Sequence, residues 1–218
     1  MTRVAIIGAH GKVGQQILHL LYDAGHESVG VIRNPDHAED IIRLGGEPLV
    51  HDLEHSTAED FAAALEGVDA LVFTAGAGPD SGPERKRTVD LGASVLSQEA
   101  AAIAGVRRFV QISAIGVDEP LADDTEEGWR AYVEAKRDAD TALRGTDLDW
   151  TILRPGGLTN DDGTGLIALG ESVEKGSIPR EDVAATVIAV LADPSSIGAT
   201  WEIVSGETPV EDAVAAGA

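Results

Sequence analysis

The sequence predicts an α/β protein with a doubly wound parallel sheet and a very small substrate-side segment near its C-terminal end. Short apolar runs of strand length alternate with segments of helical spacing, the pattern of a parallel sheet covered by helices on both faces. The first run, Val4–Ile7, leads directly into a turn containing Gly8, Gly11 and Gly14. A strand, a glycine turn and a helix in this order are typical of a Rossmann-type sheet, and we expect one domain over residues 1–218.

The glycine turn has the chemistry of a dinucleotide-binding site. Gly8 permits the tight turn, Gly11 lets the backbone approach a diphosphate, and Gly14 lets the following helix pack against the strand. The free N–H groups at the helix N-terminus bind phosphate charge, and a lysine in the first helical turn also favours a nearby anion. The predicted phosphate-binding residues are Gly8, His10, Gly11, Lys12, Val13 and Gly14. The alternative is a strand–helix turn with only a structural role.

The first half of the chain continues with alternating helices and strands. Apolar residues at helical spacing predict a helix over Gln15–Ala24. The segment Ser56–Glu59 has the form of a capping box and opens a helix that stops at Gly67. The other expected elements are a strand at Ser28–Ile32, a helix at Asp36–Leu44, and strands at Pro48–Val50 and Ala70–Thr74.

The second half begins with a long helix, because Pro83 suits a first helical turn and Gly105 caps the end after Ala104. The elements that follow are a strand at Arg108–Ile112, an acidic loop over 117–127, a helix at Gly128–Arg144, a strand at Trp150–Leu153, a helix at Glu181–Leu191 and a strand at Thr200–Val204. Residues 154–178 are glycine-rich and form the expected substrate-side segment. The small residues over 210–218 predict a flexible tail.

The chain is strongly acidic, with 38 Asp and Glu residues against 16 Lys and Arg residues and a net charge of −22. Such a surface repels a phosphate backbone, so we expect no nucleic-acid partner. We identify no signal peptide and no apolar run long enough to span a membrane, and therefore expect a cytoplasmic protein without membrane contact. The chain has no cysteine and its histidines lack metal-ligand spacing, so we expect no metal site.

Residues that follow the strands are the candidates for ligand contacts, because ligands of open α/β sheets lie beyond the carboxyl ends of the strands. After the second strand, NAD sites usually carry an acidic residue, whereas this chain has Arg33 followed by Asn34. A guanidinium can bind the 2′-phosphate of NADP with two hydrogen bonds, so Arg33 favours NADP over NAD. The alternative is an exposed arginine at a turn.

Two further segments are predicted to contact the cofactor. Asp52 can accept a hydrogen bond from the adenine amino group, with Leu53 against the ring, or it can instead form an Asx turn. Thr74, Ala75 and Gly76 are small, as required where the backbone passes close to a cofactor. The alternative for these three residues is a flexible loop.

Ser113, Tyr132 and Lys136 form the candidate catalytic set. Ser113 follows the fifth strand, while Tyr132 and Lys136 are one helical turn apart and share a face. On a face that lines the cofactor crevice, Lys136 would bind the nicotinamide ribose and lower the pKa of Tyr132 from about 10. Tyr132 would then act as general acid on a carbonyl oxygen that the Ser113 hydroxyl orients and polarises. The alternative is an amphipathic helix with a half-buried tyrosine.

With these motifs the chain resembles the short-chain dehydrogenase/reductase superfamily. It is most similar to the atypical branch with flavin-reductase-like and NmrA-like members, related to the NAD-dependent epimerases/dehydratases. The segments that carry the resemblance are Gly8–Gly14, Arg33–Pro35, Val110–Gly116, Tyr132–Lys136 and Leu153–Thr159.

The resemblance implies a dinucleotide on the glycine turn and a catalytic triad of Ser113, Tyr132 and Lys136. It also implies nicotinamide contacts from the segment after the sixth strand, namely Pro155, Gly156 and Leu158. Ile112, at the end of the fifth strand, is a further predicted cofactor-binding residue. Classical members carry a catalytic Asn on the helix after the fourth strand, where this chain offers Asp90.

We therefore expect an NADP(H)-binding oxidoreductase that reduces a small carbonyl, quinone or flavin-like acceptor. Two alternatives stay open: a sugar epimerase or dehydratase, in which Tyr132 and Lys136 run a transient oxidation, and a non-catalytic NADP(H) sensor. The expected partner is a small-molecule substrate. By analogy with classical relatives, the helices over 84–104 and 128–144 would form the face of a homodimer.

Overall fold

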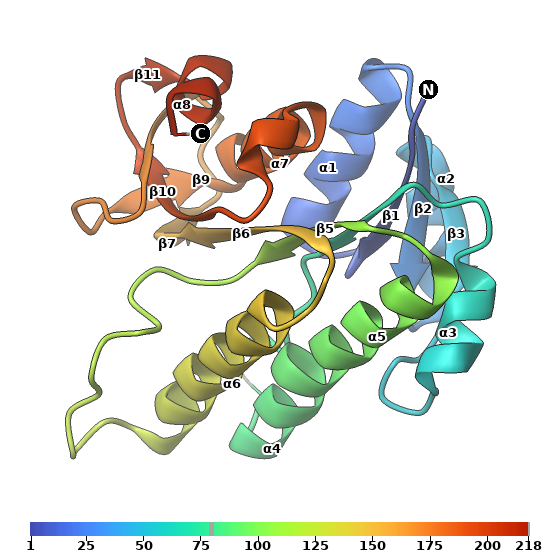
Figure 1. The fold of residues 1–218 in the computed structure, drawn as a ribbon, viewed down its shortest axis with the longest axis horizontal. Coiled ribbons are helices and arrows are strands. Elements are labelled where there is room, and N and C mark those ends of the chain that lie inside the picture. The colour runs from blue at the N-terminus through green and yellow to red at the C-terminus, as the bar shows by residue number, and fades with distance from the viewer. Residues whose placement is uncertain (79–80, 218) are drawn as a thin grey trace.

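The computed structural model describes residues 1–78 and 81–217, which form a central sheet with helices on both faces (Figure 1). Seven described strands are parallel, in the order β3-β2-β1-β4-β5-β6-β10. Their bounds are Arg3–Ile7 (β1), Glu27–Ile32 (β2), Glu47–Val50 (β3), Ala70–Phe73 (β4), Arg108–Ile112 (β5), Asp149–Pro155 (β6) and Thr200–Ser205 (β10). The order reverses between β1 and β4, so a crevice for ligands is expected at the carboxyl ends of these strands.

Shorter strands extend this architecture near the C-terminal end of the chain. β8 pairs antiparallel with β10, β11 pairs with β8, and β7 and β9 form a separate parallel pair. Their bounds are Gly157–Thr159 (β7), Leu166–Gly170 (β8), Ser177–Pro179 (β9) and Thr208–Pro209 (β11). The weakly patterned segment over 154–178 therefore contains short strands joined by loops.

Helices α1, α7 and α8 lie on one face of the sheet, and α3, α5 and α6 lie on the other (Figure 1). The helix bounds are Lys12–Asp23 (α1), Ala38–Arg43 (α2), Ala58–Ala64 (α3), Pro83–Arg85 (α4), Ser94–Ala104 (α5), Glu127–Arg144 (α6), Arg180–Ala192 (α7) and Val210–Gly217 (α8). Short 3₁₀ turns cover Pro35–His37 and Pro194–Ser196. A π-helical stretch, Lys86–Ala93, joins α4 to α5, so the long helix predicted from Pro83 to Ala104 is continuous but irregular.

Each face of the sheet has its own hydrophobic core. Phe61 and Phe109 are fully buried on the side of α3 and α5, while Ile17 and Trp201 are buried on the side of α1 and α7. Because parallel strands are covered on both faces, most of their residues are apolar. This explains why the alternating apolar runs of the sequence predict the fold class correctly.

The C-terminal tail differs from the prediction. Residues 210–217 form α8, and Val210, Ala213 and Val214 are buried against α7 and β8. The small side chains that suggested fraying instead let this helix pack closely. The segment predicted to be a flexible tail is thus helical over 210–217, and Ala218 lies outside the described residues.

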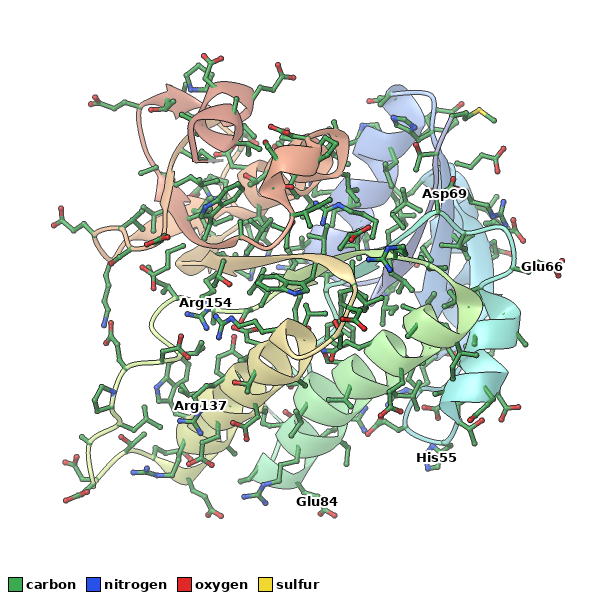
Figure 2. The ribbon with its side chains drawn as sticks, viewed as in Figure 1. His55, Glu66, Asp69, Glu84, Arg137 and Arg154 are labelled. Atoms are coloured by element: carbon green, nitrogen blue, oxygen red, sulfur yellow. The ribbon has the colours of Figure 1, made fainter. Side chains whose placement is uncertain are left out.

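The acidic residues lie mainly on the outside of the molecule. Figure 2 shows Glu66, Asp69 and Glu84 at its periphery, and all three are exposed. Among the described residues, no helix is long and apolar enough to cross a membrane.

Candidate active site

The turn between β1 and α1 requires glycine at two positions. Gly8 has φ +83°, and a Cβ there would lie 2.7 Å from the Ala75 Cα. A Cβ on Gly14 would lie 2.6 Å from the Gly8 carbonyl oxygen. The glycines thus hold the turn against both the loop after β4 and the start of α1, as the sequence predicts.

The N-terminus of α1 is free to bind an anion. Its N-cap is Gly11, which provides no side-chain cap, and the first helical turn carries no acidic residue. The first N–H groups of a helix have no intrahelical partner, so here they can donate to a ligand. A Cβ on Gly11 would lie 3.0 Å from the Gly8 carbonyl oxygen, so a side chain at this position would crowd the turn. This cradle fits a diphosphate.

A cleft of about 340 Å³ opens beside the turn, at the carboxyl ends of the first four strands. Its size lies within the usual range for small-molecule and cofactor sites. The predicted cofactor residues that line it are Gly8, His10, Gly11, Arg33, Asn34, Asp52, Leu53, Ala75 and Gly76. Lining residues that sequence reasoning did not assign include His37, His51, Glu54, Arg85, Val89 and Ala93.

Glu54 joins two arginines at one side of this cleft. Its Oε2 atom lies 2.9 Å from Arg33 Nη1 and 2.8 Å from Arg85 Nη2. Its Oε1 atom accepts a hydrogen bond of 2.7 Å from the Thr88 hydroxyl. Arg33 is exposed, as expected for an arginine at a turn. It also forms an ion pair with Glu54 and lines the cleft.

Two other predicted residues of the cleft have local roles. The Asp52 carboxylate accepts a hydrogen bond of 3.1 Å from the Glu54 N–H, which is the Asx turn of the alternative interpretation. Burial raises the pKa of Asp52, but hydrogen bonds from His55 and from the Glu54 N–H outweigh it and leave that pKa below its usual value. His10 lies 2.9 Å from Asp40.

Lys12 lies outside the lining of the cleft and points to the substrate-side segment. Its Nζ donates to Asn160 Oδ1 at 3.0 Å, and Arg180 Nη1 donates to the same oxygen at 2.9 Å. Two cations thus share one neutral oxygen beside the glycine turn. This is a second region of positive charge in a chain whose net charge is strongly negative.

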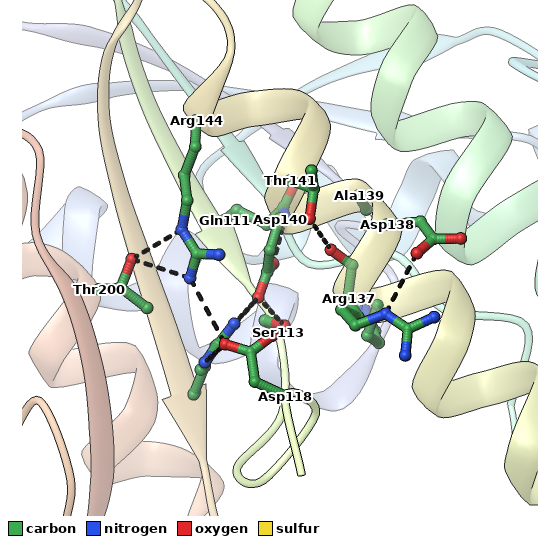
Figure 3. Close-up of polar contacts among 12 residues, drawn as sticks. Gln111, Ser113, Asp118, Arg137, Asp138, Ala139, Asp140, Thr141, Arg144 and Thr200 are labelled. Atoms are coloured by element: carbon green, nitrogen blue, oxygen red, sulfur yellow. Dashed lines mark hydrogen bonds and ion pairs between the residues drawn. The ribbon is translucent and has the colours of Figure 1, made fainter. Parts of the chain in front are cut away.

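Ser113 lies at the end of β5 in a buried polar network (Figure 3). Its hydroxyl donates to Asp140 Oδ2 at 2.8 Å, and Gln111 Nε2 donates to Asp140 Oδ1 at 2.6 Å. The Arg154 guanidinium, placed between β6 and α6, lies 2.9 Å from the same carboxylate (Figure 2). Asp118 binds the other side of Arg154 at 2.7 Å. A hydroxyl that gives its hydrogen to Asp140 is free only to accept a hydrogen bond from a ligand.

Lys136 is buried and paired with an acidic residue. Its Nζ lies 3.5 Å from Asp90 Oδ1 and donates to the Ile112 carbonyl oxygen at 3.2 Å. Asp90 also accepts a hydrogen bond of 3.0 Å from the Ala77 N–H. The helix on which classical members carry a catalytic Asn thus offers an acid, Asp90, that neutralises Lys136.

The predicted lowering of the Tyr132 pKa is wrong. Burial, together with the negative charges of Asp90 and Asp140, raises the pKa of Tyr132 to about 12. Lys136 does not counteract this because its charge is directed at Asp90. The phenol is therefore fully protonated at neutral pH.

The remaining residues predicted to bind the cofactor do not line the cleft. They are Val13, Gly14, Thr74, Ile112, Pro155, Gly156 and Leu158. Gly156 has a packing reason, because a Cβ there would lie 2.3 Å from the Gly176 carbonyl oxygen. Leu158 is partly exposed, and its carbonyl oxygen accepts a hydrogen bond from Arg180. The nicotinamide contacts of Pro155, Gly156 and Leu158, and the cofactor contacts of the other four residues, stay predictions.

Two polar residues inside apolar strands signal part of the site that sequence reasoning missed. Gln111 lies in β5 and Arg154 in β6, and a polar residue in a buried strand needs a buried partner. Asp140, one helical turn after Lys136, is the buried partner of both residues. No local signal identifies Glu54 or Arg85.

A family model described as NAD(P)H-binding matches residues 8–194, which is most of the chain and includes the glycine turn, the cleft and α6. The chain belongs to this NAD(P)H-binding family. The match confirms the predicted resemblance, and the solved structures that are similar to this chain confirm the Rossmann-type fold. Solved structures that are similar to this chain include an oxidoreductase and a reductase, so the family is oxidoreductase-like.

The names of similar proteins include both an epimerase and a reductase, which are the two kinds of enzyme expected from the sequence. The uncharacterized sugar epimerase YhfK of Bacillus subtilis is 37% identical over 213 residues, covering 97% of this chain and 98% of that protein. A solved structure from Bacillus halodurans, named for the NAD-dependent epimerases/dehydratases, is 33% identical with a TM-score of 0.92 and covers 99% of this chain and 100% of its own. The anaerobillin reductase ChuY of Escherichia coli O157:H7 is 26% identical with a TM-score of 0.75, covering 94% and 97%.

Proposed function

We propose that the protein is an NADP(H)-dependent reductase of a small carbonyl, quinone or flavin-like acceptor. The observation that carries the proposal is the grouping of Ser113, Tyr132 and Lys136 around two buried carboxylates. Asp140 accepts the Ser113 hydroxyl, Asp90 pairs with Lys136, and both carboxylates act on Tyr132. The reductase ChuY, which shares this fold over most of its length, adds support.

The residues of the cleft would hold the cofactor by complementary chemistry. The free N–H groups at the start of α1 would bind the diphosphate, with Lys12 beside them. Arg33 would bind the 2′-phosphate, and Leu53 would pack against the adenine. When bound, the reduced nicotinamide supplies a hydride to the electrophilic carbon of the acceptor.

Tyr132 would donate the proton that accompanies this reduction. A phenol with a pKa of about 12 stays protonated at neutral pH, and it can still give its proton to an alkoxide, which is a much stronger base. Ser113 would position the acceptor by accepting a hydrogen bond, since its own hydrogen is on Asp140. Lys136, held by Asp90 and the Ile112 carbonyl, would position the helix face that carries Tyr132.

The epimerase alternative is favoured by the name of YhfK and is less consistent with the state of Tyr132. An epimerase that begins with an oxidation needs a base to remove a hydroxyl proton, and the tyrosine must then start as a phenolate. Burial and two neighbouring carboxylates disfavour the phenolate here. A reductase needs only the protonated form.

A turnover screen tests the proposal. Purified protein is incubated with NADPH and a panel of small aldehydes, quinones and free flavin, and loss of the reduced nicotinamide is followed by absorbance. We expect consumption of NADPH that depends on one class of acceptor. Conversion of a sugar without net consumption of NADPH would favour the epimerase, and binding of NADPH without any turnover would favour a sensor.

Arg33→Asp should reverse the cofactor preference. The change removes a guanidinium from the cleft and adds a negative charge that repels a 2′-phosphate. We expect the affinity for NADPH to fall by about tenfold or more, with NADH affinity retained. Equilibrium titration with both nucleotides measures this. Arg137→Asp, on the far side of α6, is the matched control and should change neither affinity; equal affinity of the unmodified protein for both nucleotides would contradict the prediction.

A further inference from the structure

Three donors from two separate segments converge on the Glu54 carboxylate. Arg33 follows β2, whereas Arg85 and Thr88 lie at the start of the long helix after β4. Arg33 and Arg85 contact one carboxylate oxygen at 2.9 and 2.8 Å, and Thr88 donates to the other at 2.7 Å. The Glu54 side chain is only 16% exposed, against 55% for Arg33 and 42% for Arg85. The carboxylate is therefore the enclosed centre of the cluster.

This arrangement has the chemistry of a phosphate site. Guanidinium groups and hydroxyls directed at a common point are the donors that bind phosphate oxygens most strongly. Two arginines against one carboxylate leave a net positive charge, and Arg33, Glu54 and Arg85 all line the cleft. The rest of the chain is strongly acidic, so a positive cluster at this position calls for an anionic ligand.

We infer that Glu54 occupies the position that the cofactor's 2′-phosphate takes on binding, and that Glu54 and Arg85 together set the preference between NADPH and NADH. Arg85 is then a second ligand of the 2′-phosphate, far from Arg33 in the sequence. Glu54 is a competing anion, which holds both guanidinium groups until the phosphate replaces it. This inference rests on the proposed binding of NADP(H).

The two cofactors should respond differently to Glu54. NADPH brings negative charge to the arginines and must displace the carboxylate or bind beside it, and like charges at this distance repel. NADH brings hydroxyl groups, which can donate to a carboxylate that stays in place. Glu54 therefore weakens the binding of NADPH and does not weaken the binding of NADH. It thus reduces the preference for NADPH that the two arginines create.

The first test is Glu54→Gln, which keeps the shape of the side chain and removes its charge. The dissociation constant for NADPH should fall roughly three- to tenfold, whereas that for NADH should fall less than about twofold. Glu59→Gln, an exposed glutamate in the first turn of α3, is the matched control and should change neither constant. The loss of ion pairs can also lower the melting temperature of the free variant. In a thermal assay, we therefore compare the shift in melting temperature that each nucleotide produces, and not the melting temperature itself.

The second test is Arg85→Ala. This substitution should lower the affinity for NADPH by about tenfold or more and change the affinity for NADH by less than about twofold. Arg87→Ala is its matched control, because Arg87 lies two positions along the same helix, is exposed and does not line the cleft. That variant loses the same charge and should bind both nucleotides like the unmodified protein. Equal effects of the two arginine variants would mean that only general charge matters, and would overturn the inference.

Nucleotide binding by the unmodified protein tests the proposed function, and the differences among the variants test the role of Glu54 and Arg85. Should the unmodified protein bind neither nucleotide, the proposed function itself is wrong. Should it bind NADPH while Glu54→Gln weakens that binding as Arg85→Ala does, Glu54 only positions the arginines and the inference is overturned. A change of equal size for both nucleotides would overturn it as well.

Discussion

Replacing Tyr132 by phenylalanine is expected to slow NADPH-dependent reduction by about 10²–10⁴-fold, the usual contribution of a general acid. The substitution removes one hydroxyl and keeps the ring that packs beside Trp129. Affinity for NADPH should therefore stay within about twofold, because the diphosphate and 2′-phosphate contacts lie elsewhere. Steady-state turnover and equilibrium titration on the same preparation measure the two effects separately.

The pH dependence of the unmodified protein provides an independent test of the same residue. Burial and two carboxylates raise the pKa of Tyr132 to about 12, so the acid form persists through the neutral range. A general acid acts while protonated, and its contribution is lost only as pH rises through its pKa. The rate constant for the chemical step should thus show no alkaline decline below about pH 10 that depends on Tyr132.

Tyr22→Phe is the matched control for both measurements. Tyr22 is the other tyrosine of the chain, and it lies exposed on α1. Its substitution should leave turnover and its pH profile unchanged. Full activity of Tyr132→Phe, or a Tyr132-dependent decline near neutral pH, would contradict the assigned role.

Asp140→Ala should be the most destabilising single substitution in the polar network. Asp140 is fully buried and pairs with Arg154, whose side chain is only 8% exposed. Removing the carboxylate leaves a buried guanidinium with one remaining acidic partner, Asp118, and leaves Gln111 and Ser113 without their acceptor. Breaking a buried pair in this way costs about 3–5 kcal/mol of unfolding free energy.

Urea or thermal unfolding of two variants on the same helix checks this value. Asp138→Ala removes an exposed carboxylate whose one ion pair among residues 1–78 and 81–217 is with the neighbouring Arg137, so its effect should stay within about 0.5 kcal/mol. A loss below about 1 kcal/mol for Asp140→Ala would show that the network is not essential to the fold. The contrast between the two aspartates separates burial from charge.

The parts of the fold that sequence analysis predicts well are those fixed by local chemistry. The turn at Gly8 requires a positive φ, and Gly14 has no room for a side chain, so both residues reflect constraints within a few residues of themselves. The strands are apolar on both sides because each lies between two layers of helices. Such constraints leave periodic patterns in the sequence.

The features that sequence analysis misses depend on contacts between distant segments. Glu54 meets Arg85 across 31 residues, and Ser113 meets Asp140 across 27. The state of Tyr132 shows the same limit, since the lysine one turn away suggests a lowered pKa, while Asp90 from another helix binds that lysine. Only the folded arrangement determines which charge acts on the phenol.

The most direct test of the central claim is calorimetric titration of the purified protein with NADPH and with NADH. We expect saturable binding of NADPH at one site per chain and weaker binding of NADH, because the turn at Gly8–Gly14 would bind the diphosphate and the arginines of the cleft would favour the 2′-phosphate. Absence of binding by both nucleotides at millimolar concentrations would contradict it.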